Sequence, residues 1–145
     1  MELEGQLDNG KSGKQRDFRD LDIWKLAREL RKEIYLLSEN FPKEEKYRLA
    51  DQLIRASRSA TANIAEGYGR FHYQETIQFC RQARGSLYEC LDHLTVCLDC
   101  NYISEEQFKY FETNIFHILT KLNAYINYLR EKKRVSNSTI KPLNN

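Results

Sequence analysis

The segment "RASRSATANIAEGYGR", residues Arg55–Arg70, has the spacing of a helix but little bulk along it. Its inward positions are mostly Ala, Ser and Thr, where a core helix usually carries Leu or Ile. Small side chains of this kind let another helix approach closely, either in the same chain or across a subunit boundary. The segment ends at Gly67 and Gly69, which we expect to let the backbone reverse at positive φ.

Around this segment, apolar residues recur every three or four positions in four stretches, which indicates amphipathic helices. The predicted helices run over 21–39, from Pro42 to about Glu66, from Tyr73 to Leu98, and through a stripe from Phe108 to Leu129. Ser104–Gln107, "SEEQ", is a capping box at the start of the last helix. Short connections and sustained three-four spacing predict an all-α fold, an antiparallel up-down-up-down left-handed four-helix bundle.

The length of 145 residues is enough for one domain with a core. We divide the chain into a flexible N-terminal leader (1–17), a bundle domain (18–132) and a basic, polar, flexible C-terminal tail (133–145). There is no apolar run of roughly 18 residues and no signal-peptide core. We therefore expect a cytoplasmic protein that does not enter a membrane, with its four cysteines reduced.

Cys90, His93, Cys97 and Cys100 line one face of the predicted third helix. Ten helical residues rise about 15 Å, whereas zinc lies only about 2.0–2.3 Å from each ligand. The four side chains therefore cannot share one ion, and we expect them to pack in the core. There is also no nucleophile elbow and no phosphate-binding glycine loop. The sequence predicts no catalytic residue, no metal, no cofactor and no enzymatic activity.

The net charge of +2 is too small to indicate a nucleic-acid-binding protein by itself. A stripe of arginines along the second and third helices would nevertheless suit phosphates. The alternative is a charged helix face that is only solvated. The candidate RNA-binding residues are Arg48, Arg55, Arg58, Arg70 and Arg81.

Four residues are candidate structural polar anchors: Asn63, Glu66, Arg84 and Glu89. Arg84 interrupts an apolar stripe, so its charge needs a partner, a wet channel or an interface. We expect it to pair with Glu66, because Glu89 is less well placed on the same helix. The alternative is a recessed arginine that binds an anion.

Several aromatic residues fall off the apolar stripes, among them Trp24, Tyr35, Phe71 and Phe116. They could close the edges of the core. They could also cover a subunit interface, where aromatic residues are enriched. We expect a homo-oligomer.

The combination "LADQLIRASRSATANIAEGYGR" and "FCRQARGSLYECLDHL" resembles the rRNA intervening-sequence proteins, also called four-helix bundle proteins, over about Phe18 to Arg130. Asn101 replaces the family's usual glycine, and asparagine tolerates the left-handed conformation that ends helices. Arg58 occupies a position that is commonly apolar in that family. The residues that carry the resemblance are Gln52, Arg55, Ala56, Ser59, Asn63, Ile64, Ala65, Glu66, Gly67, Gly69 and Arg70, then Ala83, Arg84, Gly85, Ser86, Leu87 and Glu89.

The resemblance implies a four-helix bundle that assembles as a ring-like homopentamer with no enzymatic activity. An RNA-related role is implied by the rRNA genes in which founding members of the family lie. A related fold serves as the accessory protein of diversity-generating reverse transcriptases. We therefore predict an oligomeric scaffold that binds RNA or an RNA-processing partner. The alternative is a protein–protein adaptor without nucleic-acid affinity, such as a reverse-transcriptase subunit.

Overall fold

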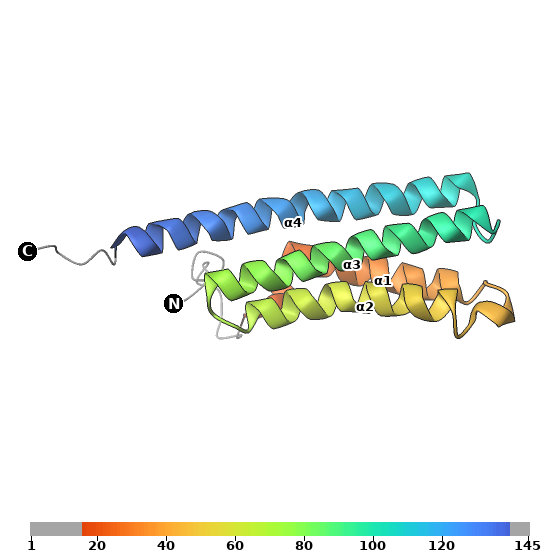
Figure 1. The fold of residues 1–145 in the computed structure, drawn as a ribbon, viewed down its shortest axis with the longest axis horizontal. Coiled ribbons are helices and arrows are strands. Elements are labelled where there is room, and N and C mark those ends of the chain that lie inside the picture. The colour runs from red at the N-terminus through yellow and green to blue at the C-terminus, as the bar shows by residue number, and fades with distance from the viewer. Residues whose placement is uncertain (1–15, 140–145) are drawn as a thin grey trace, which may run out of the picture.

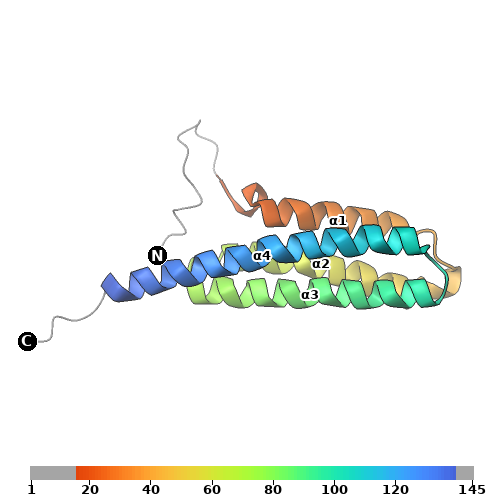
Figure 2. The ribbon, with the colours of Figure 1, turned by 90° about the horizontal axis from the view of Figure 1, so that it is seen from above.

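The computed structural model describes residues 16–139, and within that range it contains four α-helices and no strand. The all-α prediction is confirmed. The helices are α1 (Asp22–Ser38), α2 (Leu49–Tyr68), α3 (Tyr73–Asp99) and α4 (Glu105–Thr139), with short 3-10 helices η2 (Phe18–Asp20) and η3 (Lys43–Glu45). They lie lengthwise beside one another, and the α1–α2 and α2–α3 connections lie at opposite ends (Figure 1). In both views α4 runs beyond the end of α3 (Figure 2).

The most extensive helix contact joins α2 to α3, and among the α-helix pairs that touch, α1 and α4 have the smallest contact. Ala56 and Ala60 of α2 and Ala83 of α3 are fully buried. Beside them, the hydroxyl oxygens of Ser59 and Ser86 lie 2.9 Å apart. The small side chains of α2 therefore allow a close approach within the chain, as one of the two alternatives predicted.

The second helix begins at Leu49, so the prediction that it begins at Pro42 is wrong. Pro42 instead precedes η3, and its backbone is extended, with φ −54° and ψ 146°. Arg48 then separates η3 from α2 with a non-helical backbone, at φ −123° and ψ −103°. Phe41 is 92% buried and packs against the Tyr102 ring with 5.6 Å between centroids, which holds this connection against the α3–α4 turn. Proline thus begins a short helical turn here and not the long helix.

Gly67 does not have a positive φ, so its backbone conformation does not require glycine. What requires glycine here is the close approach of α3. A Cβ atom on Gly67 would lie 2.8 Å from the Cβ atom of Phe79 on α3. The Thr76 hydroxyl donates a hydrogen bond of 2.8 Å to the Gly67 carbonyl oxygen at the same contact. Gly69 is also right-handed, at φ −74°, and the left-handed residue of this turn is Phe71, at φ 57°. Our expectation that the two glycines reverse the chain at positive φ is wrong.

The capping box at the start of α4 is confirmed by two reciprocal hydrogen bonds. The Ser104 amide donates to the Gln107 side-chain oxygen at 3.0 Å, and the Gln107 amide donates to the Ser104 hydroxyl at 3.1 Å. Asn101 ends the preceding turn at φ 60°, in the left-handed conformation that asparagine tolerates.

The helix α4 extends into the segment 133–145 that we assigned to the C-terminal tail. The helix continues through Thr139, stabilised by an Arg134–Glu131 ion pair of 2.6 Å, so residues 133–139 are helical. Residues 140–145, and residues 1–15 of the predicted leader, lie outside the described part of the chain. Across 16–139, no helix has the length and hydrophobicity needed to cross a bilayer.

Candidate nucleic-acid interface

The candidate arginines of α2 are exposed but do not share one face. Arg48 stands at the non-helical residue before the helix. Arg55 points into solvent, with 78% of its side chain exposed and its guanidinium 3.7 Å from Asp51. Arg58 turns toward α1, where it lines a hollow between the two helices. The predicted stripe is therefore divided, and Arg58 is the member that faces a concave surface.

The two remaining candidate arginines lie elsewhere. Arg70 is paired with Glu66 at 3.0 Å, and its guanidinium lies 5.1 Å from the centre of the Phe79 ring. Arg81 is exposed on α3. The Arg70 charge is thus partly neutralised by Glu66 of α2, which leaves less of it for a phosphate.

The predicted pair between Arg84 and Glu66 is wrong. Arg84 donates a hydrogen bond of 2.9 Å to the Asn123 side-chain oxygen on α4. Glu66 is held by Arg70 instead, because the two are one turn apart at the end of α2. Arg84 therefore joins α3 to α4 through a neutral amide.

The other two polar anchors make local contacts. The Asn63 side-chain amide donates to the Ser59 carbonyl oxygen at 2.9 Å and to the Ser59 hydroxyl at 3.1 Å. It therefore orders the serine that meets α3. The Glu89 carboxylate lies 3.3 Å from the His93 ring nitrogen one turn along the same helix.

Three of the four cysteines are buried in the hydrophobic core, as the packing prediction required: Cys80, Cys90 and Cys97. Burial raises the pKa of each of these thiols to about 12. They are therefore protonated at neutral pH, and burial leaves them little access to reagents in solution. Cys100 is exposed, unlike its predicted role in packing. Over residues 16–139, no three His, Cys, Asp or Glu side chains come together as a metal site.

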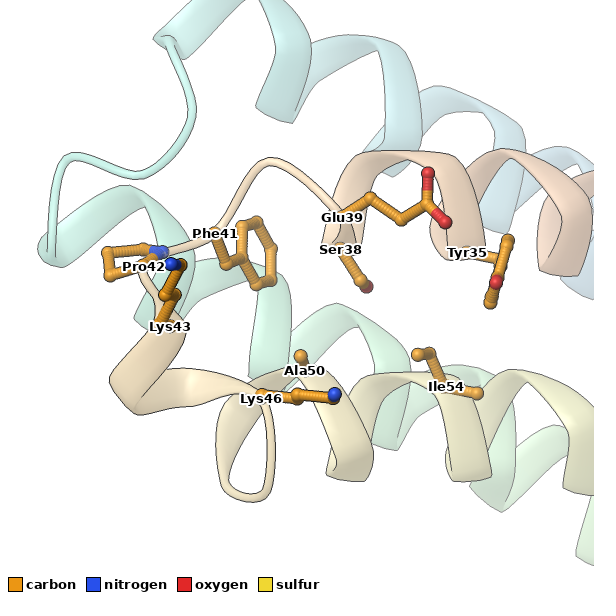
Figure 3. Close-up of a pocket in the computed structure, with 9 residues that line it drawn as sticks. All are labelled: Tyr35, Ser38, Glu39, Phe41, Pro42, Lys43, Lys46, Ala50 and Ile54. Carbon is orange, nitrogen blue, oxygen red and sulfur yellow. The ribbon is translucent and has the colours of Figure 1, made fainter.

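A hollow of about 590 Å³ lies between the end of α1 and the beginning of α2 (Figure 3). Tyr35 and Ser38 point from α1 toward Ala50 and Ile54 of α2. Phe41 and Ala50 are buried members of the core, so the floor of the hollow is apolar. Its lining residues are Tyr35, Ser38, Glu39, Phe41, Pro42, Lys43, Lys46, Ala50 and Ile54.

A second hollow, of about 310 Å³, lies beside the first and shares Tyr35 with it. Its lining residues are Arg31, Lys32, Tyr35, Leu36 and Arg58. Because Tyr35 lines both, the two hollows adjoin at its side chain. We call them together the α1–α2 groove.

The groove is strongly basic, with five basic side chains and one acidic side chain in its lining. Glu39 is the acidic one, and in Figure 3 its carboxylate lies on the α1 side, away from Ala50 and Ile54. The basic residues are Arg31, Lys32, Lys43, Lys46 and Arg58. An anion in the groove would therefore meet cations from both helices and from the connection between them.

Two of these cations differ in how firmly they are held. The Arg31 guanidinium donates to the Thr61 hydroxyl at 2.9 Å and lies 5.8 Å from the centre of the Trp24 ring, so it is fixed in place. The Thr61 hydroxyl in turn donates to the Arg58 carbonyl oxygen at 3.0 Å. Among the described residues, the Arg58 side chain has no acidic partner. The Arg58 charge is thus uncompensated, and it lies in the same hollow as the ordered Arg31 guanidinium.

Sequence reasoning found Arg58 but missed Arg31 and Lys32, and it assigned Tyr35 to a core edge or a subunit interface and not to this groove. The available signal was spacing: Arg31 and Tyr35 are four residues apart on α1, as are Ile54 and Arg58 on α2, so each pair shares one side of its helix. What the spacing did not indicate was that these two sides face each other across one groove.

Comparison with known proteins bears on the fold and the family. The model of the family described as 23S rRNA-intervening sequence protein matches residues 19–124. A crystal structure of a protein of unknown function from the S23 ribosomal protein family of Bacteroides thetaiotaomicron is similar, with a TM-score of 0.67 and 22% sequence identity. The alignment covers 72% of this chain and 97% of that one, and the likeness concerns the fold. No curated protein matches the chain.

Proposed function

We propose that this chain, which belongs to the 23S rRNA-intervening sequence protein family, is a non-enzymatic scaffold that contacts RNA through its α1–α2 groove. The observation that supports this proposal is the charge of the groove, where five basic side chains face one acidic one. The net charge of the whole chain is only +2, so this surface is much more basic than the average.

Phosphate binding by such a surface is driven by release of the counterions condensed on the nucleic acid. Arg58 lacks an acidic partner among the described residues, so a phosphate there would not have to displace an existing ion pair. Lys32 lies 3.6 Å from Glu29 with both side chains more than half exposed, and such surface pairs contribute little. Both charges are therefore available to RNA.

The protomer in this proposal is an up-down-up-down left-handed bundle, and copies assemble into a ring. Exposed apolar side chains support self-association, including Phe71 (56% exposed) in the α2–α3 connection and Phe116 (45% exposed) on α4. The ring and its five subunits are taken from the resemblance to the family. A reducing cytoplasmic setting suits the four cysteines, none of which forms a disulfide within residues 16–139.

A second candidate function is a protein–protein adaptor without nucleic-acid affinity, such as an accessory subunit of a reverse transcriptase. It is favoured by the apolar floor at Phe41, Ala50 and Ile54, which an apolar side chain of a partner would fill. RNA binding separates the two functions.

The test is binding of tag-free, nuclease-treated protein to total bacterial RNA over a series of salt concentrations. The groove variant is Lys32→Glu/Arg58→Glu, and the matched control is Arg55→Glu/Arg81→Glu, which makes the same change in charge outside the groove. Wild type and control should bind, with affinity falling steeply as salt rises. The groove variant should bind weakly, with its salt slope reduced by about 1 to 2.

Two results would contradict the proposal. If the control loses as much affinity as the groove variant, the groove is not the contact surface. If the folded wild-type protein does not bind RNA even at low salt, the adaptor function stands in its place.

A further inference from the structure

We infer that the α1–α2 groove binds single-stranded RNA, with an unpaired base stacked on Tyr35 and the flanking phosphates on the basic side chains. This inference rests on the proposed function and specifies the kind of RNA that the groove accepts. It is carried by the position of Tyr35, by the distribution of the cations around it and by the apolar floor beneath it.

Tyr35 is an aromatic side chain that the fold leaves largely unused. It is 45% exposed, and it lines both hollows of the groove. In Figure 3 its ring extends from α1 into the space above Ile54. The aromatic and cation–π contacts within residues 16–139 do not include it, in contrast to Tyr102 against Phe41 and Tyr125 against Tyr128. A ring in a basic groove without a stacking partner is the arrangement that single-stranded nucleic-acid sites use.

Basic side chains flank this ring along the groove. Arg31, Lys32 and Arg58 lie in the hollow on one side of Tyr35, and Lys43 and Lys46 line the hollow on the other side. Arg31 precedes Tyr35 by one helical turn, about 6 Å along the axis. A base on the ring would thus place the phosphate on each side of it near a cation.

The apolar floor argues for a single strand and against a duplex. Phe41 and Ala50 are buried at the bottom of the groove, and only an inserted group could contact them. A duplex keeps its bases paired and stacked inside, and its A-form helix offers phosphates and 2′-hydroxyls to a protein surface. It would engage the basic rim and leave Tyr35 and the floor empty. Unpaired bases have free faces and can enter.

The charge of the groove also favours RNA over a protein partner. A peptide that filled only the apolar floor would leave the excess of basic over acidic side chains in the groove, five against one, without a ligand. Each nucleotide of a single strand brings one negative charge together with one stacking face. Both kinds of lining residue are then used by the same ligand.

The experiment compares a fluorescein-labelled, mixed-sequence RNA of about 12 nucleotides with the same RNA annealed to its complement. Fluorescence anisotropy measures binding to the intact protein and to three variants at Tyr35: Tyr35→Ala, Tyr35→Leu and Tyr35→Phe. The matched control is Tyr88→Ala on α3, because Tyr88 is 51% exposed and lies outside the groove. Circular dichroism and elution volume are recorded for each variant.

Single-stranded RNA should bind more tightly than duplex, and Tyr35→Ala should weaken single-strand binding about 5- to 150-fold. Tyr35→Leu keeps apolar bulk without an aromatic face, so it should lose as much as Tyr35→Ala. Tyr35→Phe and Tyr88→Ala should retain the wild-type affinity. Duplex binding should be the same for all of them, since it uses only the charges.

A second readout uses Trp24, the only tryptophan in the chain, whose ring lies beside the Arg31 guanidinium. Its emission should change when unlabelled single-stranded RNA is added, because a strand in the groove contacts the Arg31 guanidinium.

The outcomes separate this inference from the proposed function. Equal affinity for both RNAs with no effect at Tyr35 overturns the inference and leaves RNA binding in place. No binding of either RNA overturns both. A changed elution volume for Tyr35→Ala also overturns the inference, because a second copy of the chain would then cover the ring.

Discussion

Gly67 lies so close to α3 that a Cβ atom on it would stand 2.8 Å from the Cβ atom of Phe79. This contact is where the two most extensively packed helices meet at their connected ends. Gly67, in the segment Arg55–Arg70, is therefore needed for helix packing, whereas its backbone conformation does not require glycine.

We expect Gly67→Ala to lower the free energy of unfolding by about 1–3 kcal/mol, because the methyl group must displace α3. Gly85→Ala is the matched control. Gly85 lies inside α3, and a Cβ atom there would meet nothing within 4 Å. That variant should be more stable by about 0.5–1 kcal/mol through helix propensity alone. Urea unfolding followed by circular dichroism measures both changes, and equal effects would refute the packing role.

The burial of three cysteines predicts selective thiol chemistry. Cys80, Cys90 and Cys97 have a pKa of about 12, so at pH 8 a thiol reagent should modify only the exposed Cys100. Mass spectrometry should show one adduct on the native protein and four after denaturation. A second rapid adduct on native protein would show that the core opens readily.

The same raised pKa values fix how stability responds to alkali. Below pH 9 the buried thiols are neutral in both states, so their contribution to stability is complete. Between pH 9 and about pH 12 they ionise only in the unfolded chain, so stability should fall as pH rises. A Cys90→Ala variant should show a weaker fall than wild type in urea midpoints measured over this range.

At acid pH, the carboxyl group of Asp17, just before η2, should titrate at an unusually low pH. Hydrogen bonds from Arg19 lower the pKa of the Asp17 carboxyl from 3.8 to about 2. A depressed carboxylate pKa stabilises the folded form above pH 3.8, and that contribution is lost as pH falls toward 2. In an Arg19→Ala variant the Asp17 pKa should return toward 3.8, which NMR titration of the carboxyl carbon would detect.

The hydrogen bond between Arg84 and Asn123 should couple α3 to α4. In a double-mutant cycle with Arg84→Ala and Asn123→Ala, we expect a coupling of about 0.5–1.5 kcal/mol. The comparison pair is Arg55 and Asp51, which are 3.7 Å apart and exposed, and which should couple more weakly. Similar couplings for the two pairs would mean that the bond to Asn123 has no special part in joining the helices.

Much of the fold could be predicted because its signals are local. The Ser104–Gln107 capping box and the apolar stripe of α4 are each read within a few residues, and both hold in the structure. The positive φ of Phe71 could not be read, because aromatic residues rarely adopt it and two glycines stood nearby. The candidate site could not be predicted from the sequence. Arg31 and Arg58 line the same hollow only because of how α1 and α2 are rotated about their axes, which no local pattern indicates.

The projection of α4 beyond its neighbours divides that helix into two regimes of stability. Its last buried residue is Leu129, and Lys133 still reaches Gln74 on α3. Past that point, the side-chain contacts found among residues 16–139 are local, such as the pair of Arg134 with Glu131. The backbone amide hydrogens of this end should therefore exchange with solvent through local fraying. The amide hydrogens before Leu129 should exchange only when the whole bundle opens. A protease could trim this basic end and leave the core intact.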